Sequence, residues 1–281
     1  MIYNLVMMCG SGYVPTPPEP WDLDNLSFVD STTITEVYLS LNGSYFSPDG
    51  SLFFAMSANS VSTVYRDIFK FSLSTPYLLS SRTLIQTKTN YTGLATVPTS
   101  MTFKDDGTEM YLVDNSGDSV RQSTLSTAWD LSTATLTTSK GIGTQTTNPW
   151  GIFFGNSGTK MYLVGNTSTN VWEFNLGTAW DVSTASVFQS YDTGSTPRSV
   201  YFKTDGTRMF TVSASSSNIR QYELTSAWDV STASLTKTKT LVASNNIPAD
   251  LLFNADGTKM FVSDGAIGSP GDRRVYNYSF A

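Results

Sequence analysis

Short runs of alternating apolar and polar residues follow one another along the chain, separated by turn sequences. In one unit, residues 197–202 form a short apolar run, and residues 209–213 and 218–224 alternate in the manner of half-buried strands. A fourth run of β-forming residues covers 234–242. No segment repeats its apolar residues at the 3.6-residue period of a helix. The pattern therefore predicts an all-β protein built from units of four antiparallel strands.

One turn sequence, Phe-x-x-Asp-Gly, marks the end of the first strand in each unit. It occurs at 46–50, 103–107, 202–206 and 253–257, and Ser157 replaces the Asp in the copy at 154–158. Successive copies lie 48 to 57 residues apart, and the last four continue Thr-x-Met followed by Tyr or Phe. Because Gly adopts positive φ without strain, Asp-Gly favours a tight hairpin. Five four-stranded repeats of this length predict the blades of a β-propeller.

A second turn sequence, Ala-Trp-Asp-Leu/Val-Ser-Thr, alternates with the first. Complete copies stand at 128–133, 179–184 and 227–232, and shortened copies stand at 76–78 and 21–23. Together the two turns resemble the Asp-Gly-Thr-x-Met-Tyr β-propeller repeats, related in pattern to the YVTN family, over residues 21–281. A Trp at the same place in successive repeats favours packing between neighbouring blades over sugar binding.

The two ends of the chain predict how the ring closes. Trp21 precedes Gly50 by 29 residues, as Trp129 precedes Gly158, whereas the last unit ends before a Trp turn of its own. Residues 21–40 should therefore pair beside residues 275–280. This predicts a five-bladed propeller whose closing blade is shared between the N- and C-terminal ends, so that no edge strand is left open. An open stack of five repeats is the alternative.

Residues 1–20 lie outside the repeat, and we expect the propeller to cover residues 21–281. The first residues are apolar and a proline-rich stretch follows, which predicts an extended arm. The apolar run is too short for a transmembrane helix, and no Lys or Arg precedes it as in a secretory signal. We expect the arm to dock into a partner protein; the alternative is that it packs on its own propeller. The candidate anchoring residues are Ile2, Tyr3, Leu5, Val6 and Met7.

The composition narrows the chemistry available to the chain. Its 281 residues include no His, one Cys, and 78 Ser and Thr, and the net charge is −6. Without His, a Ser-His-Asp triad and a His-ligated metal are excluded, and one Cys cannot form an internal disulfide. The acidic balance argues against a nucleic-acid partner. The Asp-Gly turns lack the alternating ligands of a calcium loop. We therefore predict that the protein is not an enzyme and uses no metal or cofactor.

Differences between the repeats suggest where a ligand could bind. The Asp-Gly and Trp-Asp turns should share one face, with Asp105 and Asp106 interpreted as part of a solvated turn. The loops between second and third strands and the crossings between blades form the opposite face and vary freely. Function tends to lie in such loops, although they could equally be unconstrained solvent loops. The crossings give the ligand-binding candidates Trp150, Arg198, Asp250, Asn42 and Thr99.

The Thr-Ala-Trp-Asp-Val-Ser-Thr sequences also resemble those of predicted virion and surface proteins of marine bacteriophages and bacteria. The resemblance implies a non-enzymatic virion protein, either a head decoration or a tail or fibre component, located in the virion. Such a protein would bind other virion proteins through its arm and contact host-surface glycans. One alternative is a secreted or cell-surface lectin-like adhesin. Another is a glycoside hydrolase-like enzyme, for which Asp250 is the outstanding carboxylate near the expected channel. No membrane span is expected.

Overall fold

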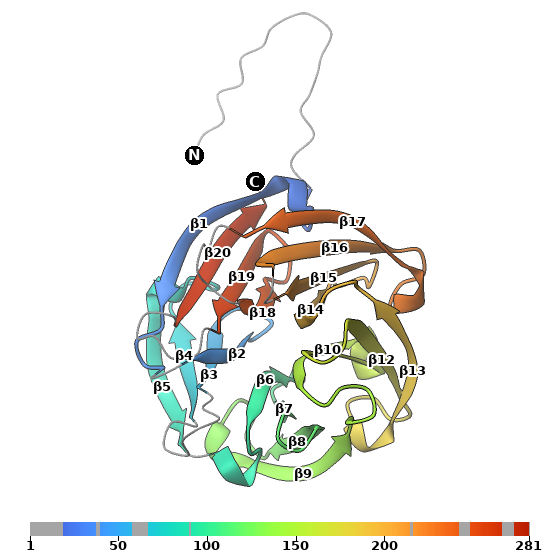
Figure 1. Cartoon of the computed structure of the whole chain (residues 1–281). Helices are drawn as coiled ribbons and strands as arrows, with labels where there is room; N and C mark the ends of the chain where they lie inside the picture. Colours follow the sequence, from blue (N-terminus) through green and yellow to red (C-terminus); the bar gives the residue numbers. More distant parts are fainter. Residues whose placement is uncertain are drawn as a thin grey trace, which may run out of the picture.

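The computed structural model describes residues 19–37, 40–57, 67–89, 91–213, 216–241, 248–265 and 273–280. These residues form five four-stranded antiparallel sheets arranged as blades around a central axis (Figure 1). The prediction of an all-β, five-bladed propeller is confirmed. The predicted anchoring residues Ile2, Tyr3, Leu5, Val6 and Met7 lie outside the described residues.

Each blade runs from an inner strand beside the axis to an outer strand at the rim. Blade 1 consists of β2 (Leu41–Phe46), β3 (Leu52–Ser57), β4 (Ile68–Leu73) and β5 (Arg82–Lys88). Blade 2 consists of β6 (Pro98–Phe103), β7 (Glu109–Asp114), β8 (Ser119–Leu125) and β9 (Ala134–Gly141). Blade 3 consists of β10 (Pro149–Gly155), β11 (Lys160–Gly165), β12 (Asn170–Leu176) and β13 (Ala185–Asp192). Blade 4 consists of β14 (Pro197–Phe202), β15 (Arg208–Ser213), β16 (Asn218–Leu224) and β17 (Ala233–Thr240).

The closing blade joins the two ends of the described chain. It contains β18 (Pro248–Phe253), β19 (Lys259–Asp264) and β20 (Arg274–Phe280), and its outer strand is β1 (Leu26–Thr33). Leu26 pairs with Phe280 in an antiparallel register, so β1 lies beside β20 (Figure 1). The backbone N–H of Trp21 donates to the Gly257 carbonyl at 3.2 Å, as Trp turns do to the Asp-Gly turns of other blades. The predicted closure is therefore confirmed, and its strand begins at Leu26.

The two repeated turns contact each other at the same end of each blade. In blade 2, Gly107 has φ +73°, and a Cβ placed there would lie 2.2 Å from the ring of Trp129. The Trp129 N–H donates to the Gly107 carbonyl at 3.0 Å. Trp129 itself has φ +65°, a left-handed conformation that the sequence pattern did not predict. Glycine is thus needed here for its backbone angle and for the space that the indole fills.

Short 3₁₀ turns recur through the described chain, most of them directly after a Trp-Asp turn or its shortened copy. They are η1 (Leu23–Asn25), η3 (Leu79–Ser81), η4 (Tyr91–Gly93), η5 (Leu131–Thr133), η6 (Asn156–Gly158), η7 (Val182–Thr184) and η8 (Val230–Thr232). In η5 the Asp130 side chain accepts a hydrogen bond from the Ser132 N–H at 2.9 Å. The Asp of the motif therefore caps the turn, as expected for a local side-chain acceptor.

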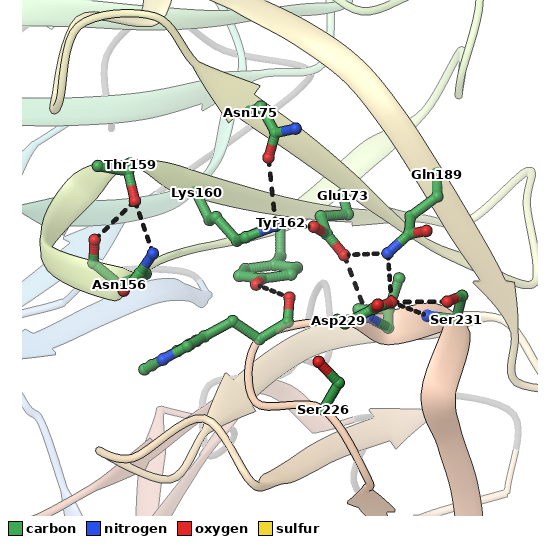
Figure 2. Close-up of polar contacts among 12 residues, drawn as sticks. Asn156, Thr159, Lys160, Tyr162, Glu173, Asn175, Gln189, Ser226, Asp229 and Ser231 are labelled. Carbon is green, nitrogen blue, oxygen red and sulfur yellow. Dashed lines mark hydrogen bonds and ion pairs between the residues drawn. The ribbon is translucent and has the colours of Figure 1, made fainter.

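The Trp rings pack between blades, as the sequence predicted. Trp129 lies 5.9 Å from Phe54 of blade 1 and 5.5 Å from Phe103 of its own blade, measured between ring centroids. Adjacent blades are also joined by buried hydrogen bonds. Glu173 of blade 3 accepts the N–H of Val230 at 3.1 Å, and Figure 2 shows the polar side chains around this contact. At four of the five seams, packing and hydrogen bonding therefore use the same turn.

Two kinds of feature are absent from the residues that the structure describes. No helix among them is long and apolar enough to cross a membrane. Nor do they bring together three Asp, Glu or Cys side chains that could hold a metal ion.

Candidate functional site

A cavity of about 390 Å³ lies on the propeller axis, at the end that carries the Asp-Gly turns. Its wall comes from the same position on all five inner strands, the residue before the repeated Phe. This side chain is partly exposed while its neighbours along the strand are mostly buried, because it lines the cavity as well as packing against the core between blades. The five residues are Tyr45, Thr102, Phe153, Tyr201 and Leu252.

Three of these five wall residues are aromatic, and each ring is supported by a Trp of the next blade. Tyr45 stacks on Trp129 with centroids 6.1 Å apart. Phe153 stacks on Trp228 at 6.4 Å, and Tyr201 stacks on Trp21 at 6.2 Å. Tyr201 and Phe153 also contact each other at 4.9 Å. The wall is therefore a preformed aromatic surface held by the packing between blades.

The floor of the cavity contains the carboxyl group of Asp250, which is 6% exposed. One oxygen, Oδ2, accepts hydrogen bonds from the backbone N–H of Ser44 at 2.9 Å and from its hydroxyl at 3.3 Å. The other, Oδ1, accepts from the Ser199 hydroxyl at 2.8 Å and the Leu251 N–H at 2.9 Å. Burial raises the pKa of Asp250 to about 6 despite these donors. The carboxyl therefore titrates close to neutral pH.

A second layer lies behind Asp250. It is formed by the residues that directly precede the positions equivalent to Asp250 on the other inner strands. The guanidinium carbon of Arg198 lies 3.9 Å from the centre of the Trp150 ring, a close cation–π contact. The Trp150 indole N–H donates to Asn148 Oδ1 at 2.9 Å, and Thr99 donates to the Pro149 carbonyl at 2.8 Å. Burial lowers the pKa of Arg198 to about 10. None of these side chains lines the cavity, so this layer separates it from the opposite face.

The five ligand-binding candidates from the sequence therefore fall into two groups. Asp250 faces the cavity, whereas Trp150, Arg198, Asn42 and Thr99 belong to the layer behind it. Trp150, Asn42 and Thr99 are buried there. The structure brings Trp150 and Arg198 into contact, but places both on the far side of the floor from the cavity. A ligand role for this group stays a prediction.

The mouth of the cavity is formed by the Asp-Gly turns. Asp105 is exposed at this rim, and its own pKa is raised by partial desolvation and by the neighbouring Asp106 charge. Burial is the main cause of the raised pKa values of Tyr45 and Tyr201, and the Asp105 charge contributes to both. Thus the acidic turn interpreted as merely solvated also sets the charge at the cavity entrance.

The aromatic wall was not predicted from the sequence. The predicted ligand-binding residues lie in the crossings between blades, whereas the wall residues lie inside regular strands next to an invariant Phe. A signal was nevertheless present: the residue before that Phe differs in the five repeats, being Tyr45, Thr102, Phe153, Tyr201 and Leu252. Such variation beside an invariant core position indicates a side chain that the core does not fully enclose.

Comparisons with known proteins support the fold. No protein-family model and no curated protein sequence matches the chain. Among solved structures, the chain is similar to a Bacteroides uniformis protein provisionally assigned as a 6-phosphogluconolactonase, at 14% identity over 85% of this chain and 71% of that one, with TM-score 0.50. A Pseudomonas aeruginosa periplasmic gluconolactonase gives 14% identity over 84% and 70%, with TM-score 0.50.

A chain of the nidogen–laminin complex is similar at 13% identity over 81% of this chain and 73% of that one, with TM-score 0.52. At these identities the likeness concerns the fold. It nevertheless corrects the prediction that the protein is not an enzyme, because structures with this architecture include gluconolactonases. The prediction was wrong because it gave more weight to the missing His and Cys chemistry than to Asp250, a carboxylate that can act in acid–base chemistry without either residue.

Proposed function

We propose that this propeller binds a small carbohydrate in its central cavity. The apolar face of a sugar ring would lie against the aromatic wall, and its hydroxyl groups would point toward the floor. The cavity of about 390 Å³ is at the lower end of the roughly 300–1,000 Å³ typical of small-molecule sites. Apolar walls with a few fixed polar groups are the usual composition of such sites.

The observation that carries this proposal is the placement of one buried carboxyl group at the bottom of an aromatic-walled cavity. Asp250 is fixed by four hydrogen bonds from Ser44, Ser199 and Leu251, so its position is set before a ligand arrives. Hydrogen bonds to an ionised carboxylate are stronger than those between neutral groups. A preformed acceptor of this kind favours a ligand rich in hydroxyl donors.

The experiment compares two cavity variants with one variant on the outer strand of blade 3, by calorimetric titration with monosaccharides. Thr102→Tyr should abolish binding by filling the cavity, and it should fold normally because Tyr45 and Tyr201 occupy the equivalent position in other blades. Tyr201→Ala should weaken binding at least about tenfold. Phe188→Ala, on the outer strand where Phe188 is 56% exposed, is the control and should bind like the unaltered protein. Equal affinities in all four proteins would contradict the proposal.

Hydrolysis of a sugar lactone in the same cavity is a second candidate, favoured by the pKa of about 6 for Asp250. The ionised carboxylate would take a proton from a water molecule as that water attacks the lactone carbonyl. The carbonyl–ring-oxygen bond would then break, and the carboxyl would return the proton to the ring oxygen, which leaves as an alcohol. The similarity to gluconolactonases adds to this candidate. Turnover of gluconolactone above the uncatalysed rate, reduced at least about a hundredfold in Asp250→Asn, would support it; a rate equal to buffer alone would not.

The setting in which a carbohydrate would be bound is proposed from the sequence resemblance. We propose that the propeller is displayed on a bacteriophage particle and held there by residues 1–20, where it would contact host-surface glycans. Incorporation of the full chain but not of a truncation starting at Glu19 into purified particles would support this setting. Secretion with glycan binding, independent of residues 1–18, would favour the adhesin instead.

A further inference from the structure

We propose that the ligand of the central cavity carries a protonated amine, so that the preferred carbohydrate is an amino sugar with a free ammonium group. This inference rests on the proposed carbohydrate-binding function and names the ligand class. Three features of the site lead to it: an unpaired buried carboxylate, an aromatic wall and an acidic mouth.

The first feature is that Asp250 has hydrogen-bond donors but no cation. Its four donors are two backbone N–H groups and two hydroxyls, all of them neutral. No lysine or arginine is among the described residues that line the cavity. Buried charges in folded proteins are normally paired, because a lone charge away from water is expensive. Because the carboxylate faces the cavity, a cation bound there would supply the missing partner.

The second feature is the group of aromatic rings that line the same cavity as this carboxylate. Tyr45, Phe153 and Tyr201 line the same cavity from three different blades. The face of an aromatic ring attracts an organic cation, and cages of several rings are a common way to recognise ammonium groups. A bare metal ion usually needs several charged or strongly coordinating side chains, and the described residues contain no group of three Asp, Glu or Cys that could hold one. The wall therefore suits an organic cation better than a metal.

The third feature is the charge at the entrance. Asp105 lies at the mouth, and the lysines of the neighbouring turns are already paired with other carboxylates. Lys104 contacts Asp106 at 2.8 Å, and Lys203 contacts Asp205 at 2.9 Å. Acidic groups thus stand at the mouth and at the floor, which would attract a cation and repel an anion. A sugar acid or sugar phosphate is disfavoured by the same charges.

The test uses three sugars that differ at a single position. Glucosamine carries an ammonium group at carbon 2, N-acetylglucosamine a neutral amide, and glucose a hydroxyl. At pH 7 and low salt, glucosamine should bind about tenfold more tightly than either neutral sugar. In Asp250→Asn the preference should fall to less than about twofold, because glucosamine loses more affinity than glucose when the charge is removed. Asp105→Asn, at the exposed rim, should reduce the preference by a smaller factor without any risk to folding.

The outcomes separate this inference from the function on which it rests. If glucose and glucosamine bind equally well to the unaltered protein, the cavity binds carbohydrate but the ammonium inference is overturned. If neither sugar binds and Thr102→Tyr changes nothing, the proposed function itself fails. If the preference for glucosamine survives in both Asp variants, the cation is recognised elsewhere and the assignment to this cavity is wrong. Thermal melting of each variant shows whether it is folded.

Discussion

The turns of this propeller carry nearly the same residues in every blade, whereas the wall of its cavity carries different residues at one equivalent position. Each Trp turn packs on the glycine of its own blade, as Trp129 does on Gly107. The wall position instead holds Tyr, Thr, Phe, Tyr and Leu. The turn residues that the blades share repeat one stabilising contact and join each blade to the next. The wall residues differ between blades, so they make the five-fold scaffold asymmetric at the place where a ligand would bind.

The largest effect should follow from removing the closing turn and strand together. A truncation that starts at Thr35 lacks Trp21 and β1, so it exposes the edge of β20 and leaves the closing blade without a Trp turn. We expect no cooperative monomeric melt, because the ring can no longer bury its seam. A truncation that starts at Glu19 keeps both features and is the control. A normal melting curve for the shorter protein would show that closure contributes little.

The second prediction compares two glycines that share a backbone conformation. Gly257 has φ +71° and Gly194 has φ +68°, but a Cβ on Gly257 would lie 1.9 Å from the Trp21 ring, while nothing lies within 4 Å of one on Gly194. Ala at Gly194 should cost about 1 kcal/mol of stability through the backbone strain alone. Ala at Gly257 should cost about 4 kcal/mol, because it also displaces a buried indole. Chemical denaturation of the two variants measures the difference; equal losses would mean that the indole contact is not stabilising.

These contrasts also explain how much the sequence could reveal. Phe-x-x-Asp-Gly and Trp-Asp are local signals whose spacing determines strand order, blade number and the partner of β1. The cavity depends on which side chains converge on the axis from five blades, and local periodicity carries no information about that. Asp250 could be identified because an acid stands out where its four equivalents are Gly43, Ser100, Gly151 and Ser199. Tyr201 was missed although its position varies between the repeats, since an aromatic residue in a strand usually indicates core.

The third prediction concerns the pH dependence of stability. The pKa of Asp250 is raised to about 6 in the folded state, so its ionisation opposes folding above the unfolded-state value and this penalty disappears as the pH falls. Between pH 7.5 and 4.5 the protein should gain about 2 kcal/mol of stability relative to Asp250→Asn. The comparison with the variant removes the contributions of other carboxyl groups. Parallel pH profiles would show that Asp250 has an ordinary pKa.

Protonation of Asp250 should also change ligand binding. Affinity for a cation should fall as the pH falls, whereas stability should rise. Protonation of Asp250 below pH 6 removes the negative charge at the floor, so a permanently charged cation such as choline should bind more weakly as the pH falls. Asp105 and the tyrosines Tyr45, Tyr77 and Tyr201 also line this cavity, and the raised pKa of Asp105 makes it the second group to consider. Asp105→Asn should therefore keep the decline, whereas Asp250→Asn should remove most of it. A decline that persists in Asp250→Asn would assign the effect to another group.

The smallest effect is expected where two blades use different residues for the same contact. Glu173 accepts the Val230 N–H, while the equivalent Gln122 accepts the Val182 N–H at 3.0 Å. Figure 2 shows that Glu173 also lies beside Lys160 and Gln189. Glu173→Gln keeps an acceptor for the inter-blade bond but gives up the ion pair with Lys160, which still has Asn175 as a partner at 3.2 Å.

We therefore expect Glu173→Gln to change stability by about 1 kcal/mol or less, because losing the ion pair is offset by no longer burying a charge. Glu173→Ala is the matched control and should cost about 3 kcal/mol, since it leaves the Val230 N–H buried without an acceptor and opens a cavity at the seam. Urea denaturation of both variants measures the two losses. If the Gln variant were as unstable as the Ala variant, the seam would depend on the charge of this residue and not on the backbone hydrogen bond that its blades share.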